Sequence, residues 1–186
     1  MNDFTGVFRL GPDSGRVVIK TGRVGLAARA GHDLTFEVTR WSATVTVPGD
    51  DGGGMAGAEV TAELHLGSLA VIEGTGGAKP LTDRDRRDIL TAAGKILGGG
   101  TASFTSARII PAASGGAIEG TLTLNGQTRP ARLQLVSRGP GQYRGTATVR
   151  QTDYGITPYT GFFGALKLKD EVTVELEADL TRAARE

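Results

Sequence analysis

The sequence predicts an all-β protein, an eight-stranded antiparallel barrel with one amphipathic helix, at about residues 82–97, packed on it. Apolar residues recur mainly at every second position, which is the spacing of half-buried strands, and only one segment has helical spacing. Closing the sheet removes both edges and leaves room for one slender ligand. An immunoglobulin-like sandwich is the competing fold, but its Cys–Trp–Cys core is absent. We expect a single domain, residues 1–186, because no linker or repeat divides the chain.

Composition narrows the function classes. The chain has 21 Lys and Arg against 20 Asp and Glu, so the total charge gives no strong attraction to nucleic acid or anionic lipid. It has no cysteine, which excludes disulfides and thiolate chemistry. Residues 1–6 lack the basic and apolar pattern of a secretory signal, and no segment approaches the roughly 20 apolar residues that cross a bilayer. We therefore expect a cytoplasmic protein without an integral membrane segment.

Glycine is unusually frequent, at 29 of 186 residues, about twice the usual share of roughly 7%. The runs Gly52–Gly54, Gly98–Gly100 and Gly115–Gly116 lie at segment ends and predict tight connections. Gly120 and Gly145 fall inside strand patterns, where a missing side chain permits sharp curvature.

Six segments alternate clearly between apolar and polar residues. Their apolar faces are Val17 and Ile19; Leu34, Phe36 and Val38; Trp41, Ala43, Val45 and Val47; Val60, Ala62, Leu64 and Leu66; Tyr143, Gly145, Ala147 and Val149; and Val172, Val174, Leu176, Ala178 and Leu180. The alternation changes phase near Thr39–Arg40, which predicts a bulge or short corner. Residues 104–110 form a weaker strand candidate.

A hairpin is predicted around Asn125-Gly126, because this dipeptide suits a two-residue type I′ turn. The turn fixes the register of the two strands that it joins. It pairs Leu124 with Gln127, Leu122 with Arg129, Gly120 with Ala131 and Ile118 with Leu133. The apolar residues of both strands then share one face, consisting of Ile118, Leu122, Leu124, Ala131, Leu133 and Leu135.

The helix is predicted to begin after Thr82, which with Asp85 resembles a capping box. Its apolar stripe is Ile89, Ala93, Ile96 and Leu97, and Gly98 suits the C-terminal exit. The later segment 157–169 is left open between a loop and a short helix.

Few residues are candidates for chemistry. His32 is two residues before Leu34 and four before Phe36, so it should point to the same inward face. It could therefore contact a ligand headgroup or report pH. The favoured interpretation is a hydrogen bond to a neighbouring loop. Asp153-Tyr154-Gly155 could transfer protons but more often forms a turn. His65, the other histidine of the sequence, shares the face of Thr61 and Glu63 and should point to solvent. It therefore cannot join His32 as a metal ligand, and we expect no metal site.

The predicted inward face mixes medium aliphatic residues with Gly and Ala, which leaves space inside a wide barrel. An apolar cavity of this kind stays dry and takes up apolar ligands. A barrel with a filled core is the alternative.

Several stretches, taken in order, resemble the YceI-like family of polyisoprenoid-binding, lipocalin-like proteins. They are residues 30–38, 79–85, 102–106, 120–130, 149–156 and 170–174, and they span nearly the whole chain. The resemblance implies an eight-stranded lipocalin-like barrel with a helix packed on it, a long hydrophobic channel for an isoprenoid chain, and a homodimer.

We therefore expect a binding, storage or transport protein for a long-chain apolar ligand such as a polyisoprenoid or an isoprenoid quinone, with no cofactor other than a bound lipid. The expected channel lining is Leu34, Phe36, Val38, Leu64, Phe104, Leu122, Leu133, Val149, Val174 and Leu176, with His32 and Arg29 at the mouth. A barrel enzyme of the cyclase or isomerase type that uses His32 or Asp153 is the rival hypothesis, and a ligand-free stress-related scaffold is a third.

Overall fold

A computed structural model describes residues 4–49 and 54–185. The predicted turn residues Gly52 and Gly53, and residues 1–3, lie outside the described part. The regular elements are β1 (Gly6–Leu10), β2 (Gly15–Lys20), β3 (Arg23–Val24), β4 (Asp33–Val38), β5 (Trp41–Val47), β6 (Glu59–His65), β7 (Leu69–Thr75), α1 (Asp83–Leu97), β8 (Thr101–Ala112), β9 (Gly115–Leu124), β10 (Gln127–Gly139), β11 (Gln142–Arg150), β12 (Thr160–Gly161), β13 (Leu166–Leu168), β14 (Glu171–Asp179) and β15 (Ala184–Arg185).

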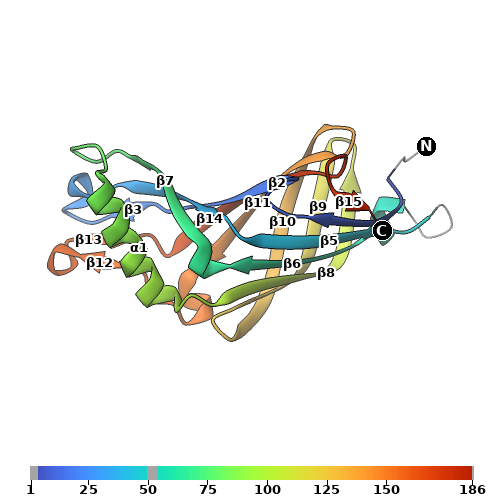
Figure 1. Cartoon of the computed structure of the whole chain (residues 1–186). Coiled ribbons are helices and arrows are strands. Elements are labelled where there is room, and N and C mark those ends of the chain that lie inside the picture. Colours follow the sequence, from blue (N-terminus) through green and yellow to red (C-terminus); the bar gives the residue numbers. More distant parts are fainter. Residues whose placement is uncertain (1–3, 50–53, 186) are drawn as a thin grey trace.

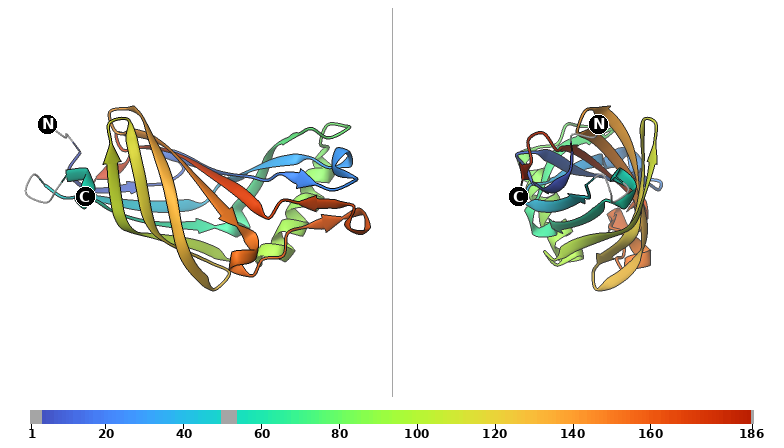
Figure 2. Two further views of the ribbon diagram at one scale, coloured as in Figure 1. Left: turned by 180° about the vertical axis from the view of Figure 1, so that it is seen from behind. Right: turned by 90° about the vertical axis from the view of Figure 1, so that its right-hand side faces the viewer.

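The main sheet contains 12 strands in the order β15-β1-β5-β6-β8-β9-β10-β11-β14-β2-β4-β7, and its paired neighbours are antiparallel. It curls strongly about the long axis of the molecule, as the end-on view shows (Figure 2). The predicted all-β class with a single α-helix in the described part is confirmed.

Several labelled strands are segments of longer, interrupted strands. β1 and β2 are joined by four residues and pair with β5 and β4, which are themselves joined at Thr39–Arg40. β6 and β7 continue each other through the short 3₁₀ turn η4 (Leu66–Ser68). The backbone N–H of Arg40 donates to Ser68 Oγ at 2.9 Å, which fixes the corner predicted there. Counted with their interruptions, eight long strands surround the axis, and β14 pairs back to β2.

Three strands of the main sheet, β1, β7 and the two-residue β15, were not anticipated. β1 is only five residues long, and β7 begins with an apolar run that lacks alternation. The weak candidate at residues 104–110 is part of β8, which has 12 residues.

The Asn125-Gly126 hairpin is confirmed. Both turn residues have positive φ, 50° and 72°, as a type I′ turn requires. The register in the structure contains all four predicted pairs, from Leu124 opposite Gln127 to Ile118 opposite Leu133.

Helix α1 is also confirmed. Thr82 and Asp85 form a reciprocal capping box, and Gly98 ends the helix in the left-handed conformation. The helix lies across the end of the barrel that also carries the small sheet β12-β13-β3, whereas β1 and β15 lie toward the opposite end (Figure 1). Residues 157–169 contain β12, the 3₁₀ turn η6 (Phe162–Gly164) and β13, so neither a plain loop nor one short helix describes them fully.

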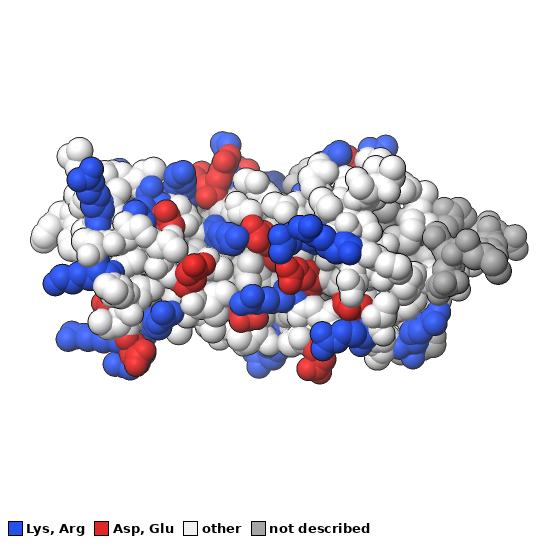
Figure 3. Space-filling model, turned by 90° about the horizontal axis from the view of Figure 1, so that it is seen from above, with Lys and Arg blue, Asp and Glu red and all other residues white. Residues whose placement is uncertain are grey.

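The largest buried cluster includes Phe8, Val38, Trp41, Val47 and Ile109. Basic and acidic side chains intermingle over the outer face (Figure 3). Many of them form cross-strand ion pairs, such as Arg16–Glu37 and Lys20–Glu175, both at 2.9 Å. Exposed pairs of this kind contribute little stability each.

Candidate functional site

An apolar cavity of about 1080 Å³ runs through the barrel. Its volume slightly exceeds the usual range for small-molecule pockets, roughly 300–1,000 Å³. Aliphatic side chains form most of the wall because alternate residues of the main strands point inward. α1 covers part of the cavity with the stripe Ile89, Ala92, Ala93, Ile96 and Leu97.

Most residues of the expected lining reach this cavity. They are Leu34, Phe36, Leu64, Phe104, Leu122, Leu133, Val149, Val174 and Leu176, together with His32 at the rim. The structure brings them together on one continuous surface, and their contact with a ligand stays a prediction.

Two expected residues do not line the cavity. Val38 has the inward parity of β4, but it is only 1% exposed and packs within the main buried cluster. Arg29 lies in the 3₁₀ turn η1 (Ala28–Ala30) with an exposed side chain, and its carbonyl oxygen accepts from the Ala78 N–H at 3.1 Å. Its neighbours Ala30 and Gly31 line the cavity instead.

Sequence reasoning missed other parts of the wall. Trp41, Tyr143 and Tyr154 add aromatic surface, and Leu81 lies just before α1. Strand parity could have found Trp41 and Tyr143, since both share the inward face of their strands. The helix stripe was recognised as apolar, but nothing in the sequence placed it over the cavity.

The cavity reaches the surface between β10 and β11. These two strands pair only from Gln134 opposite Thr146 onward, so residues 127–133 of β10 have no partner in β11. The lining there includes Arg132, Thr148 and Arg150, which belong to the outer face of the sheet. The wall therefore has a lateral opening at this point.

A second opening lies at the end that carries α1. His32 Nε2 is 2.7 Å from the carbonyl oxygen of Lys79, so the rim histidine is bound to the connection that leads into the helix. The lining here includes Lys79, Asp85 and Asp88 on one side and Phe162 on the other. This rim combines charged groups with aromatic surface.

The segment Asp153-Tyr154-Gly155 forms a turn, as the favoured interpretation predicted. It is the end of η5 (Gln151–Tyr154), and Gly155 takes the left-handed conformation at φ 68°. Asn125 Nδ2 donates to the Tyr154 carbonyl at 2.9 Å, which holds this turn against the β9–β10 hairpin. Burial, assisted by the nearby Asp153 carboxylate, raises the pKa of the Tyr154 phenol.

The described residues contain no cluster of three or more His, Cys, Asp or Glu side chains that could hold a metal ion. They also contain no helix long and apolar enough to span a bilayer.

Solved structures with the same fold come from several bacteria. Burkholderia cenocepacia BcnA aligns with a TM-score of 0.57 and 18% identity, covering 88% of this chain and 94% of that one. A polyisoprenoid-binding domain from Saccharophagus degradans, implicated in plant cell wall breakdown, aligns with a TM-score of 0.53 and 11% identity. The alignment covers 94% of this chain and 97% of that one. A mutant of the Campylobacter jejuni YceI protein aligns with a TM-score of 0.51 and 12% identity, covering 81% of this chain and 84% of that one. These similarities show the fold alone.

No curated protein sequence matches the chain. The model of the YceI-like domain matches residues 18–180, which is most of the sequence. The chain therefore belongs to the YceI-like domain family.

Proposed function

We propose that this protein binds and carries a long-chain apolar lipid, with a polyisoprenoid or isoprenoid-quinone tail held inside the barrel. The continuous apolar cavity of about 1080 Å³ is the observation that carries the proposal. A filled-core scaffold is disfavoured because that space lies among the side chains that would have to fill it.

The energetics favour a long tail. Each methylene transferred from water to an apolar environment contributes about 0.8 kcal/mol, so several isoprene units bind tightly without a specific polar contact. Charged residues of the lining lie at both openings, Asp85 and Asp88 at the α1 end and Arg132 and Arg150 between β10 and β11, where a headgroup would meet water. His32 is our candidate for the rim at the α1 end, and Arg29 lies outside the lining next to Ala30 and Gly31, which belong to it.

The structural neighbour from Saccharophagus degradans supports the isoprenoid class, because it is described as a polyisoprenoid-binding domain. We propose a binding protein rather than an enzyme, with the lipid as cargo and not a catalytic cofactor. His32 is engaged with a backbone carbonyl, which argues against a free acid or base at that position. The homodimer implied by the family resemblance stays a prediction.

Native mass spectrometry, followed by organic extraction and lipid analysis, tests this function. We expect a stoichiometric isoprenoid adduct, or uptake of added polyprenol or quinone. A clean apo mass that ignores both additives would contradict the proposal.

A matched pair of variants shows where the lipid lies. Ala147→Phe places a ring on the cavity wall and is expected to reduce the bound lipid. Thr146→Phe places the same ring on the exposed face of β11 and is expected to leave lipid content unchanged.

A further inference from the structure

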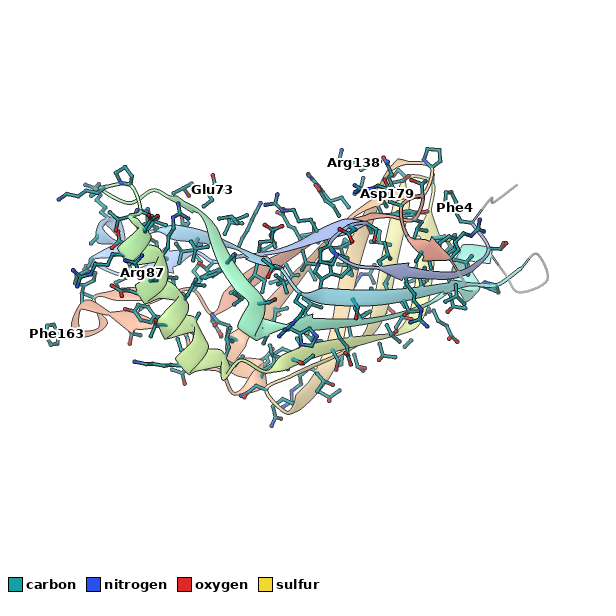
Figure 4. The ribbon with its side chains drawn as sticks, viewed as in Figure 1. Phe4, Glu73, Arg87, Arg138, Phe163 and Asp179 are labelled. Carbon is teal, nitrogen blue, oxygen red and sulfur yellow. The ribbon has the colours of Figure 1, made fainter. Side chains whose placement is uncertain are left out.

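Exposed large hydrophobic side chains gather at one end of the molecule. Leu26 and Phe163 are 102% and 113% exposed, and Phe162 is 60% exposed. With Val24 and Tyr159 they form what we call the apolar tip, which holds five of the seven exposed large hydrophobic residues in the described part of the chain. Phe163 points away from the barrel at the end that carries α1 (Figure 4).

The apolar tip has a defined backbone structure, because two connections far apart in sequence are hydrogen-bonded to each other in it. Lys167 of β13 pairs with Val24 of β3, and the Ala27 N–H donates to the Ala165 carbonyl at 3.0 Å. Phe162 and Phe163 both have positive φ, 50° and 55°. Bulky residues rarely adopt this conformation, and such strain is typical of functional segments.

The apolar tip is continuous with the cavity. Tyr159 and Phe162 belong to both, and the buried Leu166 of β13 also lines the cavity. A lipid that leaves the cavity at this end therefore meets the exposed aromatic surface directly.

The charged residues of the two connections are also all basic. Residues 21–31 and 156–169 contain Arg23, Arg29, Lys167 and Lys169 and no Asp or Glu. Arg23 forms an ion pair with Asp33 at 3.4 Å. Within the described residues the other three have no carboxylate partner. This basic excess belongs to the two connections, whereas Asp85 and Asp88 lie on the α1 side of the same mouth.

We propose that the apolar tip docks on an anionic lipid bilayer, inserting Leu26 and Phe163 into the interfacial region with the cavity mouth facing the membrane. Exposed Phe and Leu side chains flanked by Lys and Arg are the groups that bind such interfaces. Each Lys or Arg near an anionic surface adds attraction. Transfer of lipid cargo through the mouth rests on the proposed function, whereas docking itself does not.

A second copy of the chain is a poorer occupant of the same surface. Two apolar tips facing each other would bring Arg29, Lys167 and Lys169 of both copies together. Like charges opposed across an interface suppress that association.

Vesicle flotation tests the proposal. The full chain is expected to float with vesicles of phosphatidylcholine and phosphatidylglycerol, less with phosphatidylcholine alone, and less again at high salt. Leu26→Ser with Phe163→Ser should reduce partitioning at least about tenfold, since both side chains lose apolar area that would be buried. Arg29→Glu with Lys167→Glu should remove the preference for the anionic vesicles.

The matched control is Ile72→Ser with Val136→Ser, which removes two exposed apolar side chains outside the apolar tip. It should float like the unmodified chain. Equal flotation of the tip and control variants would overturn the proposal. Light scattering that shows a dimer lost only in the tip variant, with no flotation of any form, would also overturn it and assign the surface to self-association.

Native mass spectrometry of the same samples separates the two proposals. Tip variants that keep their lipid but no longer float support docking as a separate step. Flotation of a chain that neither carries lipid nor takes up added polyprenol or quinone would leave docking intact and contradict the proposed cargo.

Discussion

His32 Nε2 lies 2.7 Å from the carbonyl oxygen of Lys79. A carbonyl oxygen only accepts hydrogen bonds, so Nε2 carries the proton and donates it. The bond ties the residue before β4 to the connection that enters α1, and both residues line the cavity rim. His32 therefore has the structural role that its sequence context favoured, a hydrogen bond to a neighbouring loop.

Replacing His32 by Ala should lower the free energy of unfolding by about 1 kcal/mol, the usual net value of one hydrogen bond, while lipid binding survives. Denaturant unfolding and native mass spectrometry measure the two effects. His65→Ala, at a residue outside the cavity lining, is the control and should change both less. Turnover of a bound isoprenoid that disappears in the His32 variant would instead support the enzyme hypothesis.

Gly120 allows β8 and β9 to pack closely around Phe104. A Cβ atom at Gly120 would lie 2.8 Å from the Phe104 ring and closer still to the Thr105 carbonyl oxygen. Gly120→Ala should therefore cost about 1–3 kcal/mol through overpacking. Gly94→Ala, within α1, meets no atom within 4 Å and should stabilise by roughly 0.5–1 kcal/mol. Thermal unfolding of both variants checks the contrast, and equal shifts would argue against the close approach.

Sequence reasoning succeeded where local chemistry fixes the structure. The Asn125-Gly126 turn dictates its own register, and Thr82, Asp85 and Gly98 mark both ends of α1 within a few residues. Alternation likewise identified the inward face of most strands, and with it much of the strand-borne wall of the cavity.

The remainder depends on contacts that periodicity does not encode. Parity gives the direction of Val38 but not its depth, and neighbours from other strands bury it. β10 and β11 pair only from Gln134 opposite Thr146 onward, and alternation does not show where such pairing stops, so no local pattern predicts the lateral opening. The apolar tip is likewise assembled from connections more than 100 residues apart.

The capping box gives the helix a dependence on acid pH. Hydrogen bonds from the Thr82 hydroxyl and backbone N–H lower the pKa of the Asp85 carboxyl below its ordinary value of 3.8. A lowered folded-state pKa adds stability that is fully present above the unfolded pKa of 3.8, begins to decline near that pH, and is lost as pH falls through the lower folded-state pKa. The stability difference between the unmodified chain and Asp85→Asn should therefore shrink from pH 6 to pH 3.

Urea unfolding across that pH range measures the difference. Thr82→Ala removes the hydroxyl donor, so it should both destabilise the helix and weaken this pH dependence. An undiminished pH dependence in Thr82→Ala would mean that another carboxyl is responsible.

The β9 wall offers the most direct test of which face meets the lipid. Leu122 lines the cavity, whereas its neighbour Thr121 is exposed on the outer face. Leu122→Asp places a charge in an apolar, poorly hydrated space, so we expect loss of the bound isoprenoid or of folding. Thr121→Asp introduces the same residue type into the same strand and should keep both the fold and the bound isoprenoid.

Circular dichroism reports folding in these variants, and mass spectrometry reports the lipid. If Leu122→Asp does not fold, Leu122→Trp tests the same wall by adding bulk and should lower lipid content without adding charge. A folded Leu122→Asp protein with unchanged lipid would show that the ligand does not lie against this face. The interior would then need another occupant. Adjacent residues of one strand point to opposite faces, so Leu122 and Thr121 cannot both face the lipid.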